Sequence, residues 1–144
     1  MKKSITKMTQ KTLVVITLLT VAMSTSFAFH KAEDTPIAYI ISPVDGATVP
    51  QTFVVQFGLK GMGVSPAGIE RKHTGHHHLL VDAKTLPPLD KSLGSEVTHF
   101  GGGQTQTELT LEKGTHTLQL ILGDHLHVPH SPAVVSKKIT ITVE

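Results

Sequence analysis

The sequence predicts an all-β protein, an immunoglobulin-like antiparallel β-sandwich of about seven strands that follows an N-terminal signal peptide. Apolar and polar residues alternate with the period of two that is typical of strands, and helical patterning is absent. Glycine, proline and Asp-Gly turn signals separate short alternating segments. Seven such segments in a chain of ordinary domain size fit a sandwich of this class.

The first 28 residues have the pattern of a secretory signal peptide. Four lysines give a basic start, residues 12–23 are apolar, and Ser26-Phe27-Ala28 is a small-residue cleavage pattern. The apolar run is shorter than the roughly 20 residues that cross a bilayer, so we expect no stable membrane anchor after cleavage. We therefore expect a periplasmic or secreted protein, with a signal peptide at residues 1–28 and a single domain at residues 29–144.

Removal of the signal peptide reverses the sign of the net charge. The full chain has 13 basic and 11 acidic residues; without the four leader lysines, 9 basic residues face 11 acidic ones, a formal charge of −2. The basic pI therefore belongs to the leader, and the remaining chain has no electrostatic footprint for nucleic acid. We expect no DNA or RNA partner.

The first half of the domain is predicted to contain three strands. Residues 36–42 form the first strand, which ends at a turn marked by Asp45-Gly46. Residues 53–60 form the second, with Phe53, Val55, Phe57 and Leu59 on one face. A long glycine-containing loop, residues 61–75, leads into the third strand at residues 76–82.

The second half is predicted to contain four more strands. A Pro87-Pro88 pair marks a loop before them, and three turn-rich segments separate them. The predicted strands are residues 95–100, 104–111, 115–122 and 134–143. In this topology the loops between strands two and three, four and five, and six and seven gather at one end of the sandwich.

Histidines are concentrated at that end, and they predict a metal site. The chain has ten histidines and no cysteine, and neutral imidazole is the commonest protein ligand for zinc, copper and nickel. His76 and His78, like His125 and His127, have the i, i+2 spacing that places two side chains on one face of an extended strand. The predicted metal ligands are His76, His78, His127, His130, His125 and His99.

The ligand types narrow the choice of metal. Imidazoles with little carboxylate suit copper(II), zinc or nickel, and no thiolate is present. After the signal peptide Met62 is the remaining methionine, so a methionine-rich copper(I) site cannot form. We expect copper(II) or zinc as the cofactor.

The pattern leaves the orientation of the histidine triplet open. If Leu79 and Val81 face the core, His77 is buried with them and His76 and His78 face outward; if Leu80 faces the core, the assignment reverses.

Two further polar residues have structural interpretations. His116, at the start of a strand and at the opposite end of the sandwich, is predicted to be a hydrogen-bonded corner residue rather than a ligand. Asp124 follows Gly123 at a strand end, a position more typical of a turn former than of a partner that orients a ligating imidazole.

Several ordered segments resemble a known bacterial family. They are residues 75–82 (GHHHLLVD), 100–105 (FGGGQT), 114–120 (GTHTLQL) and 123–130 (GDHLHVPH), and they resemble the family catalogued as domain of unknown function 4399. The resemblance implies a small exported domain and no particular activity. It draws attention to His76, His77, His78, His127 and His130, whereas His125 stands where the family pattern is permissive.

Three classes of function follow from these observations. The first is metal storage, delivery or resistance; the second is docking of an envelope protein by the histidine-rich end; the third is metal-dependent catalysis. Catalysis is the least favoured, because the His-Glu-x-x-His and Gly-x-Ser-x-Gly motifs are absent and only Glu70 and Asp124 are nearby carboxylates. The run Gly101-Gly102-Gly103 lacks the lysine of a phosphate loop and instead allows close backbone approach.

Overall fold

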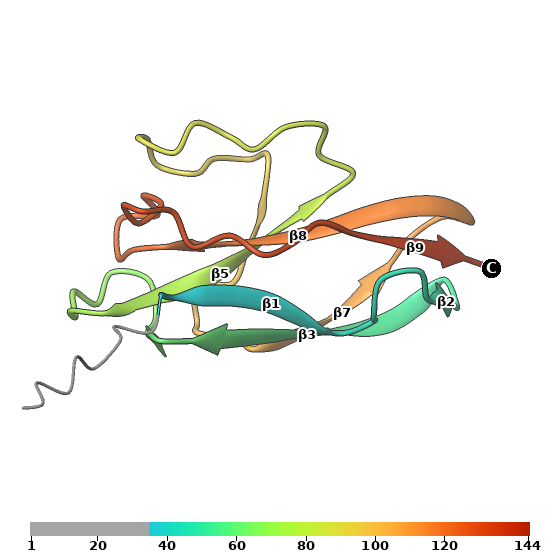
Figure 1. Ribbon diagram of the computed structural model, residues 1–144, viewed down its shortest axis with the longest axis horizontal. Helices are drawn as coiled ribbons and strands as arrows, with labels where there is room; N and C mark the ends of the chain where they lie inside the picture. The colour runs from blue at the N-terminus through green and yellow to red at the C-terminus, as the bar shows by residue number, and fades with distance from the viewer. Residues whose placement is uncertain (1–34) are drawn as a thin grey trace, which may run out of the picture. The chain divides into compact units, whose positions relative to one another are not determined.

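The computed structural model describes residues 35–144, so the predicted signal peptide lies outside the described residues. The described residues form an all-β sandwich without helices, which confirms the predicted fold class (Figure 1). One sheet has three strands in the order β1-β3-β7, namely β1 (Ile37–Ser42), β3 (Thr52–Lys60) and β7 (Gln106–Thr110). Among residues 35–144 no helix is long and apolar enough to span a membrane.

The second sheet carries the histidine triplet of residues 76–78 and has the order β2-β9-β8-β5-β4, with β6 also paired to β5. Its strands are β2 (Thr48–Val49), β4 (Gly63–Val64), β5 (Thr74–Val81), β6 (Thr98–His99), β8 (Gly114–Gly123) and β9 (Ile139–Val143). The groups β1-β3-β7 and β9-β8-β5 correspond to the A-B-E and G-F-C strands of an immunoglobulin-like sandwich.

The main core lies between the two sheets and follows the alternation seen in the sequence. Phe53, Val55 and Phe57 of β3 are buried, and Leu59 is partly buried against the same cluster. They pack against Leu118, Leu120 and Leu122 of β8 and Ile139, Ile141 and Val143 of β9. Each fully buried side chain of this size contributes about 1.5–3 kcal/mol.

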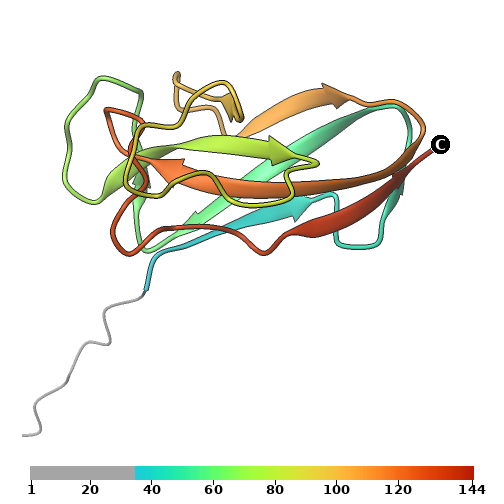
Figure 2. The ribbon, with the colours of Figure 1, turned by 90° about the horizontal axis from the view of Figure 1, so that it is seen from above.

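Strand β5 is buried on both faces. Leu79 points into the main core, whereas Leu80 belongs to a second apolar cluster with Leu93 and Ile121. The long connection between β5 and β6 crosses the outer face of β5 and supplies Leu93 (Figures 1 and 2). This second cluster explains why both faces of β5 are apolar in sequence.

Several predicted boundaries differ from the structure, and the short strand β2 was not predicted. The predicted strand 95–100 is reduced to β6, which pairs with His78 and Leu79, and the predicted loop 61–75 contains β4, which pairs in parallel with the start of β5. The predicted strand 134–143 is regular only from Ile139. Before that point the Leu120 N–H donates a hydrogen bond to the Ser136 hydroxyl, at 2.8 Å. A side-chain oxygen thus replaces the backbone carbonyl that would accept this bond in a regular strand pair.

Candidate metal centre

Strand β5 places His76 and His78 on its outer face and His77 on its inner face. His77 shares its face with Leu79 of the main core, and its ring centroid lies 5.3 Å from that of Phe57. The orientation that the sequence left open is therefore the one in which Leu79 and Val81 face the core. The side chains of His76 and His78 point toward β6 and the loop between β8 and β9.

Four imidazoles meet on this outer face, from three separate parts of the chain. His76 and His78 come from β5, His99 from β6 and His127 from the β8–β9 loop. The six distances between their ring centroids range from 4.6 to 5.9 Å.

Three of these residues form a set that can hold a metal ion. One ring nitrogen from each of His76, His99 and His127 lies within 4.8 Å of the others. Nε2 of His99 and Nε2 of His127 are 3.1 Å apart. His78 packs beside this set, with its ring stacked on that of His99 at an interplanar angle of 25°.

The buried imidazoles have unpaired nitrogen atoms. His76 and His78 are 0% and 1% exposed, and none of their four ring nitrogens has a hydrogen-bond partner among the described residues. A buried polar group without a partner costs about 1–3 kcal/mol. A metal ion would supply a partner for the nitrogen lone pairs, and the exposed His99 leaves the set accessible from solvent.

The environment favours the neutral form of three of the clustered imidazoles, His76, His78 and His99. Burial, followed by the charges of His99 and His127, lowers the pKa of His76 from 6.5 to about 4. Burial and the neighbouring His76, His99 and His127 lower the pKa of His78 to about 3. Burial and His127 also lower the pKa of His99. Because metals bind the deprotonated ring, protons do not compete for His76 and His78 at neutral pH.

Two glycines make room for the rings. A Cβ atom on Gly101 would lie 2.3 Å from Cε1 of His99, and one on Gly123 would lie 2.7 Å from Cε1 of His78. Both contacts are closer than real Cβ atoms tolerate, so these positions exclude any side chain while the rings keep their places. The glycine run 101–103 predicts close backbone approach from sequence, whereas no local pattern marks Gly123 as such a position.

Asp124 shapes the turn that carries His127. Its carboxylate Oδ1 accepts hydrogen bonds from the backbone N–H groups of Leu126 at 2.8 Å and Val128 at 2.9 Å. Within this turn His127 has a φ of 67°, in the left-handed region. Asp124 is thus a turn former, as its sequence position indicated.

The remaining predicted ligands, His125 and His130, lie elsewhere. Both line a pocket of about 230 Å³ together with Glu70, Arg71 and Asp124 among others. Nε2 of His130 lies 2.8 Å from the site of a Cβ on Gly75. Since Gly75 and His76 are consecutive in β5, His130 packs against the strand face opposite to that of His76.

His116 is a structural residue, as the sequence indicated. Its Nδ1 lies 2.7 Å from Oδ2 of Asp82, and its Nε2 lies 2.9 Å from the carbonyl oxygen of Glu112. Both partners are acceptors, so only the doubly protonated ring satisfies both. The hydrogen bond to Asp82 accordingly raises the pKa of His116.

Fold and site together define the class of this protein: an immunoglobulin-like β-sandwich domain with a histidine cluster that can hold a metal ion. The chain belongs to the family described as Domain of unknown function (DUF4399), whose family model matches residues 55–144. The matched region contains all four clustered histidines, and the membership confirms the resemblance seen in the sequence.

Comparison with other known proteins adds no functional information. None of the curated proteins matches the chain. One similar solved structure is the endo-β-1,4-mannanase from Thermotoga petrophila, at 16% identity and a TM-score of 0.45, over 76% of this chain and 20% of that one. The chain thus spans about a fifth of that enzyme's length.

Proposed function

We propose that this protein binds a transition metal ion through His76, His99 and His127, with His78 as the adjoining fourth imidazole. The ion is copper(II) or zinc, and its binding serves metal storage, delivery or resistance in the periplasm or outside the cell.

The observation that carries this proposal is the burial of His76 and His78 with no partner for their ring nitrogens. A buried histidine whose ring nitrogens lack hydrogen-bond partners raises the free energy of the folded state. Here four imidazoles from three chain segments lie with their ring centroids within 5.9 Å of one another, and the unpaired nitrogens of His76 and His78 lie among them. Metal coordination would offset it, because each neutral ring would donate one lone pair to the ion.

The donor set favours a borderline divalent ion. All four rings supply nitrogen, and the chain has no cysteine to supply thiolate. Imidazole sets of this kind suit zinc and copper(II), whereas calcium and magnesium prefer oxygen. Solvent access at His99 gives the ion a route to the site.

Single histidine variants test the proposal. His99→Ala and His127→Ala remove ligands that are not fully buried, so the fold should tolerate both changes. We expect each to weaken zinc and copper(II) binding by more than about tenfold, since loss of even an indirect partner of a ligand costs 10–100-fold. Competition titration against a chromophoric chelator measures the affinity of the folded, untagged protein.

His125→Ala is the matched control, because it removes an imidazole that is close to His127 in sequence but lines the pocket that contains His130, outside the cluster. We expect it to keep wild-type affinity. Equal affinities for all three variants and the wild type would refute the proposed ligand set.

A further inference from the structure

The long connection between β5 and β6, residues 82–97, is attached to the domain at few points. All of its residues are described, and they contain no regular strand or helix. Leu93, at 8% exposed, is the one buried side chain among them, and it packs against Leu80 and Ile121. A segment with so little buried apolar surface opens locally at a lower free energy than the core strands do.

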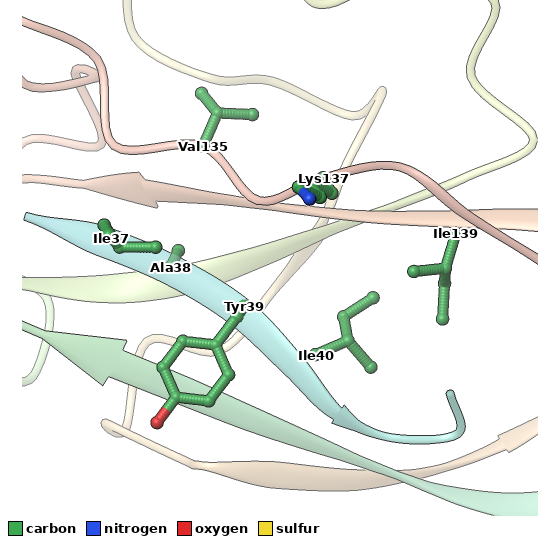
Figure 3. A pocket seen from close by; sticks show the side chains of 7 residues that line it. All are labelled: Ile37, Ala38, Tyr39, Ile40, Val135, Lys137 and Ile139. Atoms are coloured by element: carbon green, nitrogen blue, oxygen red, sulfur yellow. The ribbon is translucent and has the colours of Figure 1, made fainter. Parts of the chain in front are cut away.

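The segment that precedes β9 supports the connection at two points. Nζ of Lys138 donates a hydrogen bond to the carbonyl oxygen of Ala83, at 2.7 Å. Val135, which also lines the groove of about 290 Å³ beside β1, packs against the apolar cluster that contains Leu93 (Figure 3). Neither contact involves a clustered histidine, so the connection can dock in the metal-free protein.

Two hydrogen bonds join the connection to the turn that carries His127. The Leu93 N–H donates to the carbonyl oxygen of His127 at 3.0 Å, and the Ser92 hydroxyl donates to that of Leu126 at 3.0 Å. The turn is thus held through its N–H groups by Asp124 and through its carbonyl groups by the connection. His127 has a left-handed φ of 67°, which a histidine keeps where its surroundings impose it. The position of His127 therefore depends on the connection.

A second proposed ligand follows the connection directly. Val97, the last residue of the connection, packs against the apolar cluster on the outer face of β5, and the chain then enters β6, which carries His99. Of the three proposed ligands, His76 lies on β5, whereas His99 and His127 both adjoin the connection. Opening of the connection would therefore release the turn of His127 and loosen the start of β6.

We infer that the connection 82–97 controls the metal site, with Ser92 and Leu93 as positioning residues of His127. The connection must be docked for the ion to meet all three ligands, and the bound ion in turn holds the connection docked. Release of the ion then requires the connection to open. This coupling rests on the metal binding proposed above.

The size of the coupling follows from mass action. An ion that binds only the docked form lowers the population of the open form by a factor of 1 + [L]/Kd, where [L] is the free metal concentration. At a free concentration of about 100 times Kd, opening becomes about a hundred times rarer. By the same linkage, a substitution that favours the open form weakens metal binding.

Leu93→Ala tests this reciprocal effect. The loss of the one buried anchor favours the open form, so zinc binding should weaken by about tenfold or more. Ile139→Ala is the matched control, because Ile139 is 9% exposed, much like Leu93, but belongs to the main core. It should lower the melting temperature of the metal-free protein and keep wild-type affinity. Equal zinc affinities for the two folded variants would overturn the role of Leu93.

Amide hydrogen exchange of the wild type, measured by NMR with and without zinc, tests the coupling itself. The Leu93 N–H is freed when the connection opens, so its exchange should slow by about a hundredfold when free zinc is held at about 100 times Kd. The Gly46 N–H, which donates to the carbonyl oxygen of Thr140 outside the histidine cluster, should keep its rate.

The outcomes separate the coupling from the metal binding on which it rests. Bound zinc that leaves the exchange of the Leu93 N–H unchanged, or that slows the Leu93 and Gly46 amides equally, would overturn the coupling and leave the metal site standing. Failure to bind zinc at all, read from the chelator titration, would refute the proposed function and the coupling with it.

Discussion

Glycines, rather than the histidines themselves, fix where the imidazoles of the cluster can sit. Gly101 and Gly123 lie directly against the rings of His99 and His78. Neither is needed for a left-handed backbone, so their role here is the absence of a side chain. A methyl group added at either glycine would therefore displace an imidazole ring of the cluster.

Gly101→Ala is predicted to weaken metal binding without unfolding the domain. The new Cβ would lie 2.3 Å from Cε1 of His99, and the exposed ring would move away from His76 and His127. We expect an affinity loss of about tenfold or more, because a displaced His99 ring would no longer reach the ion held by His76 and His127. The measurement is metal competition titration with a thermal melt of the metal-free protein.

Gly102→Ala is the control in the same glycine run, because its Cβ would meet only the flexible side chain of Gln104, at 3.2 Å. If Gly101→Ala and Gly102→Ala bind metal equally well, the glycine does not position His99.

At the scale of elements, strand β5 decides both the fold and the site, because it is covered on its two faces. The sequence predicted the strand and the shared face of His76 and His78 from their spacing. It could not tell which face was inside, because Leu79 and Leu80 are both apolar and both buried. That choice depends on the 82–97 connection, whose Leu93 covers Leu80, a tertiary contact that no local pattern encodes.

The sequence pattern also could not predict the short strands β4 and β6, or that His130 lies apart from the four clustered imidazoles. β6 exists because Thr98 and His99 meet the edge of β5, and β4 because Gly63 and Val64 meet its beginning. His130 was predicted from its closeness to His127 in sequence. However, the bridge between Pro129 and Gly123 directs the chain so that His130 packs against Gly75.

Asp124 variants separate the role of the turn from the role of charge. Asp124→Ala removes the acceptor of the Leu126 and Val128 N–H groups, so the turn loosens and His127 loses its position. Asp124→Asn keeps an oxygen at Oδ1. We expect weaker metal binding, by about tenfold, for the alanine variant and near wild-type binding for the asparagine variant. Equal losses in the two variants, measured by the same titration, would mean that the charge of Asp124 matters instead.

At the scale of the whole molecule, the sandwich brings three distant segments together at the cost of burying several histidines. His77 illustrates the cost, since it is 0% exposed, packs against Phe57 and has no partner for either ring nitrogen among the described residues. It lies on the face of β5 opposite to His76 and His78. Its burial therefore affects stability independently of the metal site.

Acid is predicted to destabilise the metal-free domain partly through His77. Burial lowers the pKa of His77 from 6.5 to about 4, so the unfolded chain takes up a proton that the folded chain does not. Its full contribution to stability is present above pH 6.5 and is lost as the pH falls toward about 4. His77→Leu removes this loss, and at about pH 5 we expect it to recover about 2 kcal/mol relative to its effect above neutrality.

Urea unfolding of the metal-free wild type and His77→Leu across this pH range measures the difference. His76 and His78 titrate in both proteins, so the comparison isolates His77. Parallel pH profiles for the two proteins would show that His77 is not protonated on unfolding. Metal affinity should be retained in His77→Leu, because the ring faces away from the cluster.

X-ray absorption spectroscopy of the untagged protein, after loading with zinc or copper(II) and dialysis, tests the proposed metal site directly. We expect one ion per chain with a first shell dominated by nitrogen and the outer-shell scattering of several imidazoles. Loss of that imidazole scattering in His99→Ala, but not in His125→Ala, would assign it to the cluster. Failure to retain metal, or a first shell of oxygen without imidazole scattering, would rule out the proposed metal site.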